Sequence, residues 1–146
     1  MGYQSSSDEH VIEKLRGFVG MLNAESEKGS VVVVEGRRDA EALLSIGFTG
    51  IPAVFHNFKG VADFVDSHSH ADKKIILLLD MDRTGKYLTS RLVSQLQFRR
   101  NSVNLFYKHT LARITNGKVR HVEDLLIYAA PLSGVTGARK DLYFYA

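Results

Sequence analysis

Residues 75–86 have the sequence Ile-Ile-Leu-Leu-Leu-Asp-Met-Asp-Arg-Thr-Gly-Lys, and this stretch decides the fold class. Five aliphatic residues run without interruption into Asp80 and Asp82, and Gly85 follows. An uninterrupted apolar run indicates a buried parallel strand, because half-exposed strands alternate apolar and polar residues. Ligands bind at the carboxyl ends of the strands in open α/β sheets, so both aspartates are candidate ligand-binding residues.

A second apolar run ends in the same way. Four valines, residues 31–34, precede Glu35 and Gly36, and Asp39 follows four residues after Glu35. Carboxylates one residue apart at the end of a strand suit a hard cation such as Mg²⁺. The two strand ends therefore predict a metal site at which Glu35 faces Asp80 and Asp82.

Length and composition indicate one globular domain. The chain has 146 residues, is 45% hydrophobic and contains no cysteine, which excludes a disulfide framework, a thiolate zinc site and a cysteine nucleophile. Residues 1–7 lack the charged and apolar regions of a signal peptide, and no apolar stretch approaches the roughly 18 residues of a membrane span. We therefore expect a cytoplasmic protein with no membrane partner.

The apolar spacing predicts how the domain is divided. We expect a flexible tail over residues 1–7, a packed helix over 8–29, the main domain over 30–130 and an extension over 131–146. Asp8 is the expected N-cap of the first helix, and Gly29 the expected stop.

Strands and helices are predicted to alternate within the main domain. The expected strands are 30–35, 51–55, 74–80 and 102–107, and the expected helices are 38–46, 61 to about 68, 84–99 and 122–128. Pro52 indicates an edge or strand-start position for the second strand. Alternating elements predict an α/β fold with a mostly parallel sheet of about four strands and helices on both faces.

The two acidic strand ends together resemble the Toprim domain. The resemblance lies in Glu35-Gly36 with Asp39 after the first strand and in Asp80-x-Asp82-x-x-Gly85 after the third, and it covers roughly residues 30–130. Toprim is the catalytic module of primases, type IA and type II topoisomerases, OLD-type nucleases and small ribosomal-RNA maturases. The resemblance implies a Rossmann-like three-layer sandwich similar to the short stand-alone Toprim proteins of archaea and bacteria.

The resemblance also implies roles for individual residues. Asp80 and Asp82 would hold Mg²⁺, with Mn²⁺ as a substitute, and Glu35 would act as a general acid/base or a further ligand. Mutual repulsion of the three carboxylates should raise one pKa. We expect further residues to contact phosphate or support the site: Gly36, Arg37, Arg38, Asp39, Arg83, Gly85, Lys86, Lys108 and Glu123.

Nucleic acid, either RNA or DNA, is the expected partner, and nuclease activity of the RNA-maturase type is the expected function. The net charge of +3 permits a polyanionic partner without requiring one. One alternative is a non-catalytic subunit that binds metal and nucleic acid beside a protein partner in a larger complex. Another is a haloacid-dehalogenase-type phosphatase, because residues 80–84 match DxDx[T/V]; against it, a whole βαβ unit precedes the motif.

Overall fold

The computed structural model describes residues 6–69 and 72–133 and has the predicted α/β architecture. Four parallel strands form one sheet in the order β2-β1-β3-β4. Their bounds are Val31–Val34 (β1), Ala53–Val54 (β2), Ile75–Leu77 (β3) and Val103–Asn104 (β4). The sheet confirms the prediction of about four parallel strands, and β2 lies at the edge that Pro52 indicated.

The two central strands bury both of their faces. Val32 and Val34 of β1 pack into one hydrophobic cluster, whereas Val33 packs into a second cluster on the opposite face. Along and just after β3, Ile76 and Leu78 join the first cluster, and alternate residues join the second. Side chains of a strand point to opposite faces in turn, so the uninterrupted apolar runs fill two cores.

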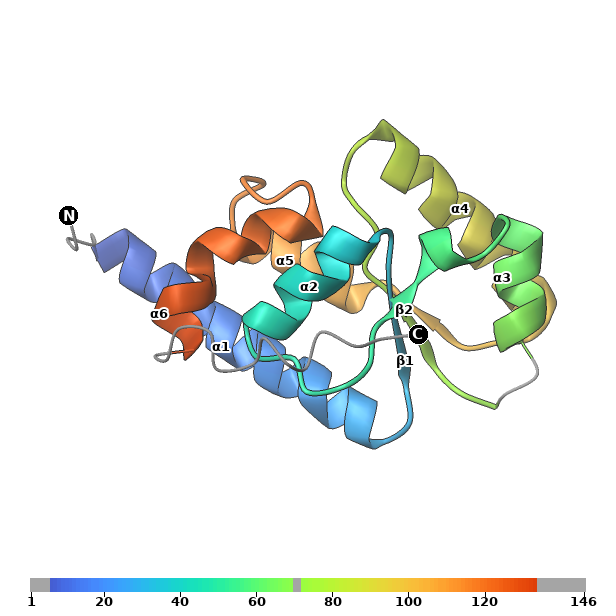
Figure 1. Ribbon diagram of the computed structural model, residues 1–146, viewed down its shortest axis with the longest axis horizontal. Coiled ribbons are helices and arrows are strands. Elements are labelled where there is room, and N and C mark those ends of the chain that lie inside the picture. Colours follow the sequence, from blue (N-terminus) through green and yellow to red (C-terminus); the bar gives the residue numbers. More distant parts are fainter. Residues whose placement is uncertain (1–5, 70–71, 134–146) are drawn as a thin grey trace.

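Helices cover both faces of the sheet (Figure 1). On one face lie α3 and α4, with bounds Val61–His68 and Arg83–Phe98. The other face is covered by α1 (Ser6–Glu27), α2 (Arg37–Ser45), α5 (Phe106–Ile114), the 3₁₀ helix η2 (Val122–Tyr128) and α6 (Ala129–Ser133). A shorter 3₁₀ helix, η1 (Phe55–Asn57), follows β2. Helix α2 of one layer follows β1 and helix α4 of the other follows β3, so each layer receives a helix from the carboxyl end of a central strand.

The N-terminal helix begins earlier than the sequence predicted. Helix α1 starts at Ser6, so Asp8 lies inside the helix and is not its N-cap. Leu15, Phe18 and Leu22 are buried against the first core at helical spacing. Gly29 has φ +94°, the left-handed conformation that suits the expected stop. Of the predicted tail, residues 1–5 lie outside the described part of the chain.

The fourth strand is shorter than predicted, and the sequence analysis missed the helix that follows it. The expected strand 102–107 is two residues of β4 and the start of α5. The Oδ1 atom of Asn104 accepts the N–H of Phe106 at 2.8 Å, which satisfies a free donor of the first helical turn. Tyr107 and Leu111, four residues apart, then face the core.

The end of the domain departs from regular helix. Residues 122–128, expected as a helix, form η2, and α6 continues directly from it. Residues 134–146, most of the expected extension, lie outside the described residues. None of the described helices has the length and apolar character needed to cross a membrane.

Candidate metal centre

Glu35 and Asp80 lie at the carboxyl ends of adjacent strands, as predicted. Each is 8% exposed, and the backbone N–H of Asp80 donates to Oε1 of Glu35 at 3.4 Å. Burial raises the pKa of Glu35, and the charges of Asp82 and Asp39 act in the same direction. Two carboxyl groups are thus desolvated side by side at one edge of the sheet.

Asp82 has a structural and an electrostatic role at the start of α4. It is the N-cap residue, and its Oδ1 accepts the N–H of Gly85 at 2.8 Å. This hydrogen bond, together with the neighbouring His121, lowers the pKa of Asp82. Its other oxygen, Oδ2, lies 3.0 Å from Nε2 of His121. Asp82 is therefore ionised at the pH values at which Asp80 begins to bind a proton.

His121 is the site residue that the sequence analysis missed. Asp80, Asp82 and His121 each offer one ligand atom, and these atoms all lie within 4.8 Å of one another. Burial lowers the pKa of His121, but the hydrogen bond to Asp82 and the charges of Asp80, Asp82 and Asp124 outweigh it and raise the pKa. Two carboxylates and one imidazole form a donor set that suits a divalent cation.

Asp80 has the most strongly perturbed carboxyl group. Its Oδ1 accepts the N–H of Val122 at 3.0 Å. Burial raises its pKa to about 7, and the charges of Asp39 and Glu35 add to the shift. A carboxyl group that is costly to ionise in the metal-free protein is a place where a cation is favoured, because a bound cation offsets the buried charge.

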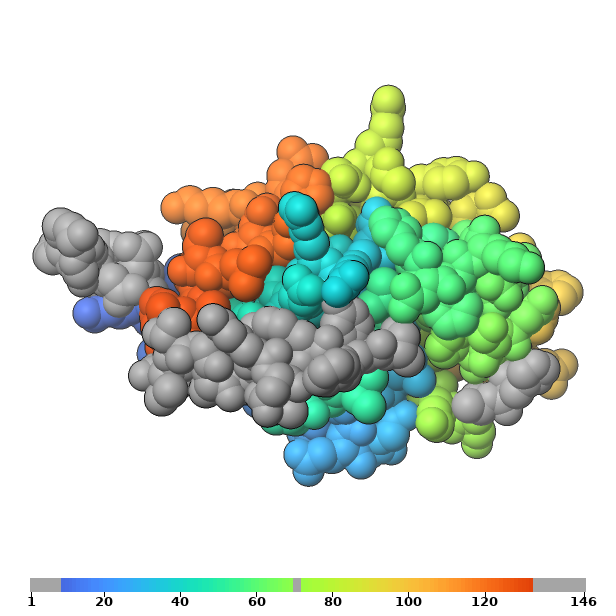
Figure 2. All heavy atoms as spheres, viewed as in Figure 1, coloured from blue at the N-terminus to red at the C-terminus, as the bar shows by residue number. Residues whose placement is uncertain are grey.

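Asp39 joins two segments that are distant in the sequence. Its Oδ2 accepts the N–H of Gly36 and its Oδ1 the N–H of Glu123, both at 2.9 Å. The first bond caps α2, and the second fixes η2 against it. Figure 2 shows the start of α2 in cyan against the orange segment that leads into η2. Burial raises the pKa of Asp39.

The segment that enters η2 closes the site through three consecutive residues. His121 contacts Asp82, the N–H of Val122 binds Asp80, and the N–H of Glu123 binds Asp39. We call residues 121–123 the clasp. The clasp contacts Asp39 of the first acidic motif and Asp80 and Asp82 of the second. It therefore fixes the position of one motif relative to the other.

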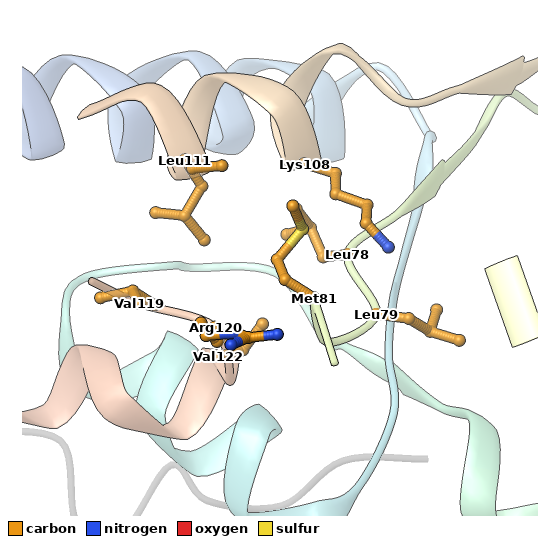
Figure 3. Close-up of a pocket in the computed structure, with 9 residues that line it drawn as sticks. Leu78, Leu79, Met81, Lys108, Leu111, Val119, Arg120 and Val122 are labelled. Carbon is orange, nitrogen blue, oxygen red and sulfur yellow. The ribbon is translucent and has the colours of Figure 1, made fainter. Parts of the chain in front are cut away.

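Lys108 is buried, with 6% exposure, next to the loop that carries Asp80 and Asp82. Its Nζ donates to the backbone oxygen of Asp80 at 3.3 Å and to Oγ1 of Thr89 at 2.9 Å. Thr89 in turn donates to the oxygen of Gly85 at 2.7 Å. Figure 3 shows Lys108 extending from α5 beside Met81. Lys108 therefore supports the loop that carries both aspartates, and burial lowers its pKa.

The other predicted residues divide into a basic rim and two close-packed glycines. Arg37, Arg38, Arg83 and Lys86 are exposed. The Nη1 atom of Arg38 lies 4.0 Å from Oε2 of Glu123, and Nε of Arg37 lies 3.6 Å from Oε2 of Glu41. The remaining two are Gly36, the N-cap of α2, and Gly85, which is buried in the first turn of α4.

The family model of the Toprim domain matches residues 30–115 of this chain. The chain belongs to the Toprim family. The match includes both acidic motifs but ends before the clasp, so His121 lies outside the part that the family model covers.

Relatives of this Toprim protein are of similar size. A UPF0292 protein of Archaeoglobus fulgidus is 30% identical over 114 residues, 78% of this chain and 88% of the relative. A UPF0292 protein of Methanocaldococcus jannaschii is 30% identical over 121 residues, 83% of this chain and 93% of the relative. A solved structure of an Aquifex aeolicus protein has a TM-score of 0.61 and 25% identity, and the alignment covers 74% of this chain and 94% of that one. The Toprim domain and the Asp80–Asp82–His121 group together indicate a metal-dependent function related to nucleic acid.

The metal-free Toprim protein is expected to lose stability as the pH rises from about 4.5 to about 7. The pKa of Asp80 is about 7 in the folded state and 3.8 ordinarily, so the folded protein keeps a proton that the unfolded chain has released. The raised pKa of His121 acts in the same direction near neutrality. The lowered pKa of Asp82 acts oppositely, but only below about pH 4, where the unfolded carboxyl group titrates.

Urea unfolding in EDTA across this pH range measures how steeply the free energy of unfolding falls with pH. Asp80→Asn should remove the largest part of this pH dependence, worth about 1–3 kcal/mol between the two ends of the range. Equal slopes in the wild type and the variant would contradict the assignment of the raised pKa to Asp80.

Proposed function

We propose that this Toprim protein is a Mg²⁺-dependent nuclease that hydrolyses phosphodiester bonds, in the manner of the small RNA maturases. The observation that carries the proposal is the buried Glu35–Asp80 pair beside Asp82 and His121, at the carboxyl ends of two central strands. Asp80, Asp82 and His121 would hold the cation. The bound cation supplies charge neutralisation at the attacked phosphate.

Glu35 is the proposed general base. Burial raises its pKa, which brings the carboxyl group closer to the pH at which proton transfer is efficient. Hydrolysis adds water across the P–O bond. As the water oxygen bonds to phosphorus, Glu35 takes one of its protons, and the P–O bond to the leaving oxygen breaks. The leaving oxygen takes a proton from solvent water, and Glu35 returns its own proton to solvent. Nε2 of His56 lies 3.9 Å from Oε2 of Glu35 and would stabilise its charged form when protonated.

The basic rim is proposed to hold the substrate backbone. Arg37 and Arg38 extend from the start of α2, and Arg83 and Lys86 from the start of α4. Both helices begin within two residues of a site carboxylate, so these cations follow closely on the acidic residues in the chain. Positive side chains in this position offset the charge of the phosphates that flank the scissile one.

Glu35→Gln separates proton transfer from metal binding. Glu35 is not among the three grouped ligand residues, so Mn²⁺ affinity measured by calorimetry should change less than about threefold. The cleavage rate of structured RNA and single-stranded DNA should fall by about 10²–10⁴-fold, the usual contribution of a general base. Loss of Mn²⁺ binding together with cleavage would instead make Glu35 a ligand.

Wild-type protein incubated with a mixed oligonucleotide panel in Mg²⁺, Mn²⁺ or EDTA tests the proposal itself. Metal-dependent products that disappear in EDTA would support it. Binding of metal and nucleic acid without any cleavage would overturn the nuclease proposal and indicate a non-catalytic subunit of a larger complex.

A further inference from the structure

Positive charge is concentrated in one continuous segment of the chain. Residues 83–122 contain nine lysine and arginine residues and no aspartate or glutamate. The other 106 residues contain ten lysine and arginine residues and all sixteen acidic residues. This asymmetry is much stronger than the net charge of +3 suggests, and it makes the segment the part of the chain whose charge most favours contact with a polyanion.

A groove lies between the two helices of this segment. Helices α4 and α5 form a depression of about 640 Å³ that Lys86, Ser90, Ser94, Gln97 and His109 line, with Lys108 in its wall. None of the described residues that line it is acidic. A second groove, of about 540 Å³ between α3 and α4, is lined by Lys59 and Arg91 but also by Asp63, which would repel a phosphate there.

The α4–α5 groove reaches the loop that carries two of the candidate metal ligands. Met81, which lines it, stands between the two aspartates, and Lys86 follows one helical turn after Asp82. Lys108 connects the groove wall to the backbone of Asp80. A strand whose phosphate lies at the centre can therefore continue into the groove without leaving the basic segment.

The side chains of the groove suit an unpaired strand. Ser90, Ser94 and Gln97 follow Lys86 on one face of α4 and provide neutral hydrogen-bonding groups, whereas Val93 and Leu105 provide an apolar surface for a base. From Lys86 to Gln97 the helix rises by roughly 17 Å, the length of about five stacked nucleotides. A duplex would present only its backbone to a groove of this size, whereas an unpaired strand can place a base in it.

We infer that the α4–α5 groove binds a single-stranded segment of nucleic acid that continues from the scissile phosphate. The inference rests on the proposed function for the direction of the strand but not for the binding itself. Charge complementarity and continuity with the metal centre identify this occupant.

A matched pair of substitutions on one helix tests the groove. Gln97 lines the groove and Gln95 does not, and both are exposed on α4. Binding of fluorescent oligo(U) and oligo(dT) is measured by anisotropy in EDTA and low salt. Gln97→Glu and Ser90→Glu should each weaken binding about fivefold or more, and Gln95→Glu less than about twofold. Equal weakening by Gln95→Glu and Gln97→Glu would overturn the inference.

Crosslinking gives an independent measurement, because the chain contains no cysteine. A photoreactive group attached to Ser94→Cys should crosslink to the oligonucleotide, and the same group on Gln95→Cys should not. Equal crosslinking from both positions, or tighter binding of a duplex than of the single strand, would contradict the groove. Both measurements omit metal, so their outcome is separate from cleavage: cleavage with unaffected groove variants would leave the nuclease proposal standing and remove only this inference.

Discussion

Replacing Asp80 by asparagine is expected to abolish metal-dependent cleavage and also to stabilise the metal-free protein. The carboxyl group belongs to the three-residue ligand group, so the cleavage rate should fall by about 10³-fold or more. Its buried charge is costly to form, as the raised pKa of about 7 shows. Asparagine keeps an oxygen that can accept the N–H of Val122, and it removes that charge.

The free energy of unfolding in EDTA at about pH 8 should therefore rise by about 1–3 kcal/mol in Asp80→Asn. In the wild type, saturating Mg²⁺ should raise the denaturation midpoint, whereas in the variant it should have little effect. Glu27→Gln, at an exposed position near the end of α1, is the charge-matched control and should change neither property. A variant that still cleaves at the wild-type rate would remove Asp80 from the site.

Replacing Gly85 by alanine is expected to cause the largest loss of stability. The added Cβ would overlap the backbone carbonyl group of Asp80, which cannot move as a flexible side chain would. Lys108 also holds that carbonyl oxygen in place. The free energy of unfolding should fall by about 3 kcal/mol or more. Because the N–H of Gly85 binds Asp82, the metal affinity should fall with it.

Gly17→Ala is the matched control, since the same substitution meets open space in α1. There alanine should stabilise the protein by about 0.5–1 kcal/mol through its higher helix propensity. Urea unfolding of the two variants in parallel measures both effects. A small effect of Gly85→Ala would contradict the close packing of α4 against the end of β3.

The central part of the fold could be predicted from the sequence because its signals are local. The valines before Glu35 and the aliphatic residues before Asp80 are long apolar runs, and parallel central strands are buried on both faces. The helix expected over 38–46 is α2 (Arg37–Ser45). Gly47, just after it, has φ +114° and donates its N–H to the oxygen of Leu44, which is typical of a helix end.

Helix α5 could not be predicted because its first residues resemble a strand. Val103, Leu105 and Tyr107 alternate with other residues, and only the turn formed by Asn104 and Phe106 ends the extended backbone. The burial of Lys108 follows from this helix. Lys108 was expected to contact phosphate or to support the site. Its burial and its hydrogen bond to the backbone of Asp80 favour the second role, and no local signal in the sequence distinguishes the two.

The sequence placed together only those acidic residues of the candidate metal centre that follow a strand directly. Asp80 and Asp82 belong to one local motif, and Glu35 ends the neighbouring strand. His121 is separated from Asp82 by 39 positions in the sequence, and its approach depends on the path of α5 and the loop that follows. Glu123, two residues after His121, is the residue of this segment that the sequence analysis assigned to the site.

A cation bound at the candidate metal centre and the local order of the clasp would depend on each other. Residues 121–123 supply one ligand side chain and two backbone donors to the acidic residues, so opening this segment exposes Asp39 and Asp80 to water and removes His121. Thermodynamic linkage is reciprocal: a cation that needs the closed segment must also hold it closed. Hydrogen exchange at the amides of Val122 and Glu123 would then slow as the cation concentration rises.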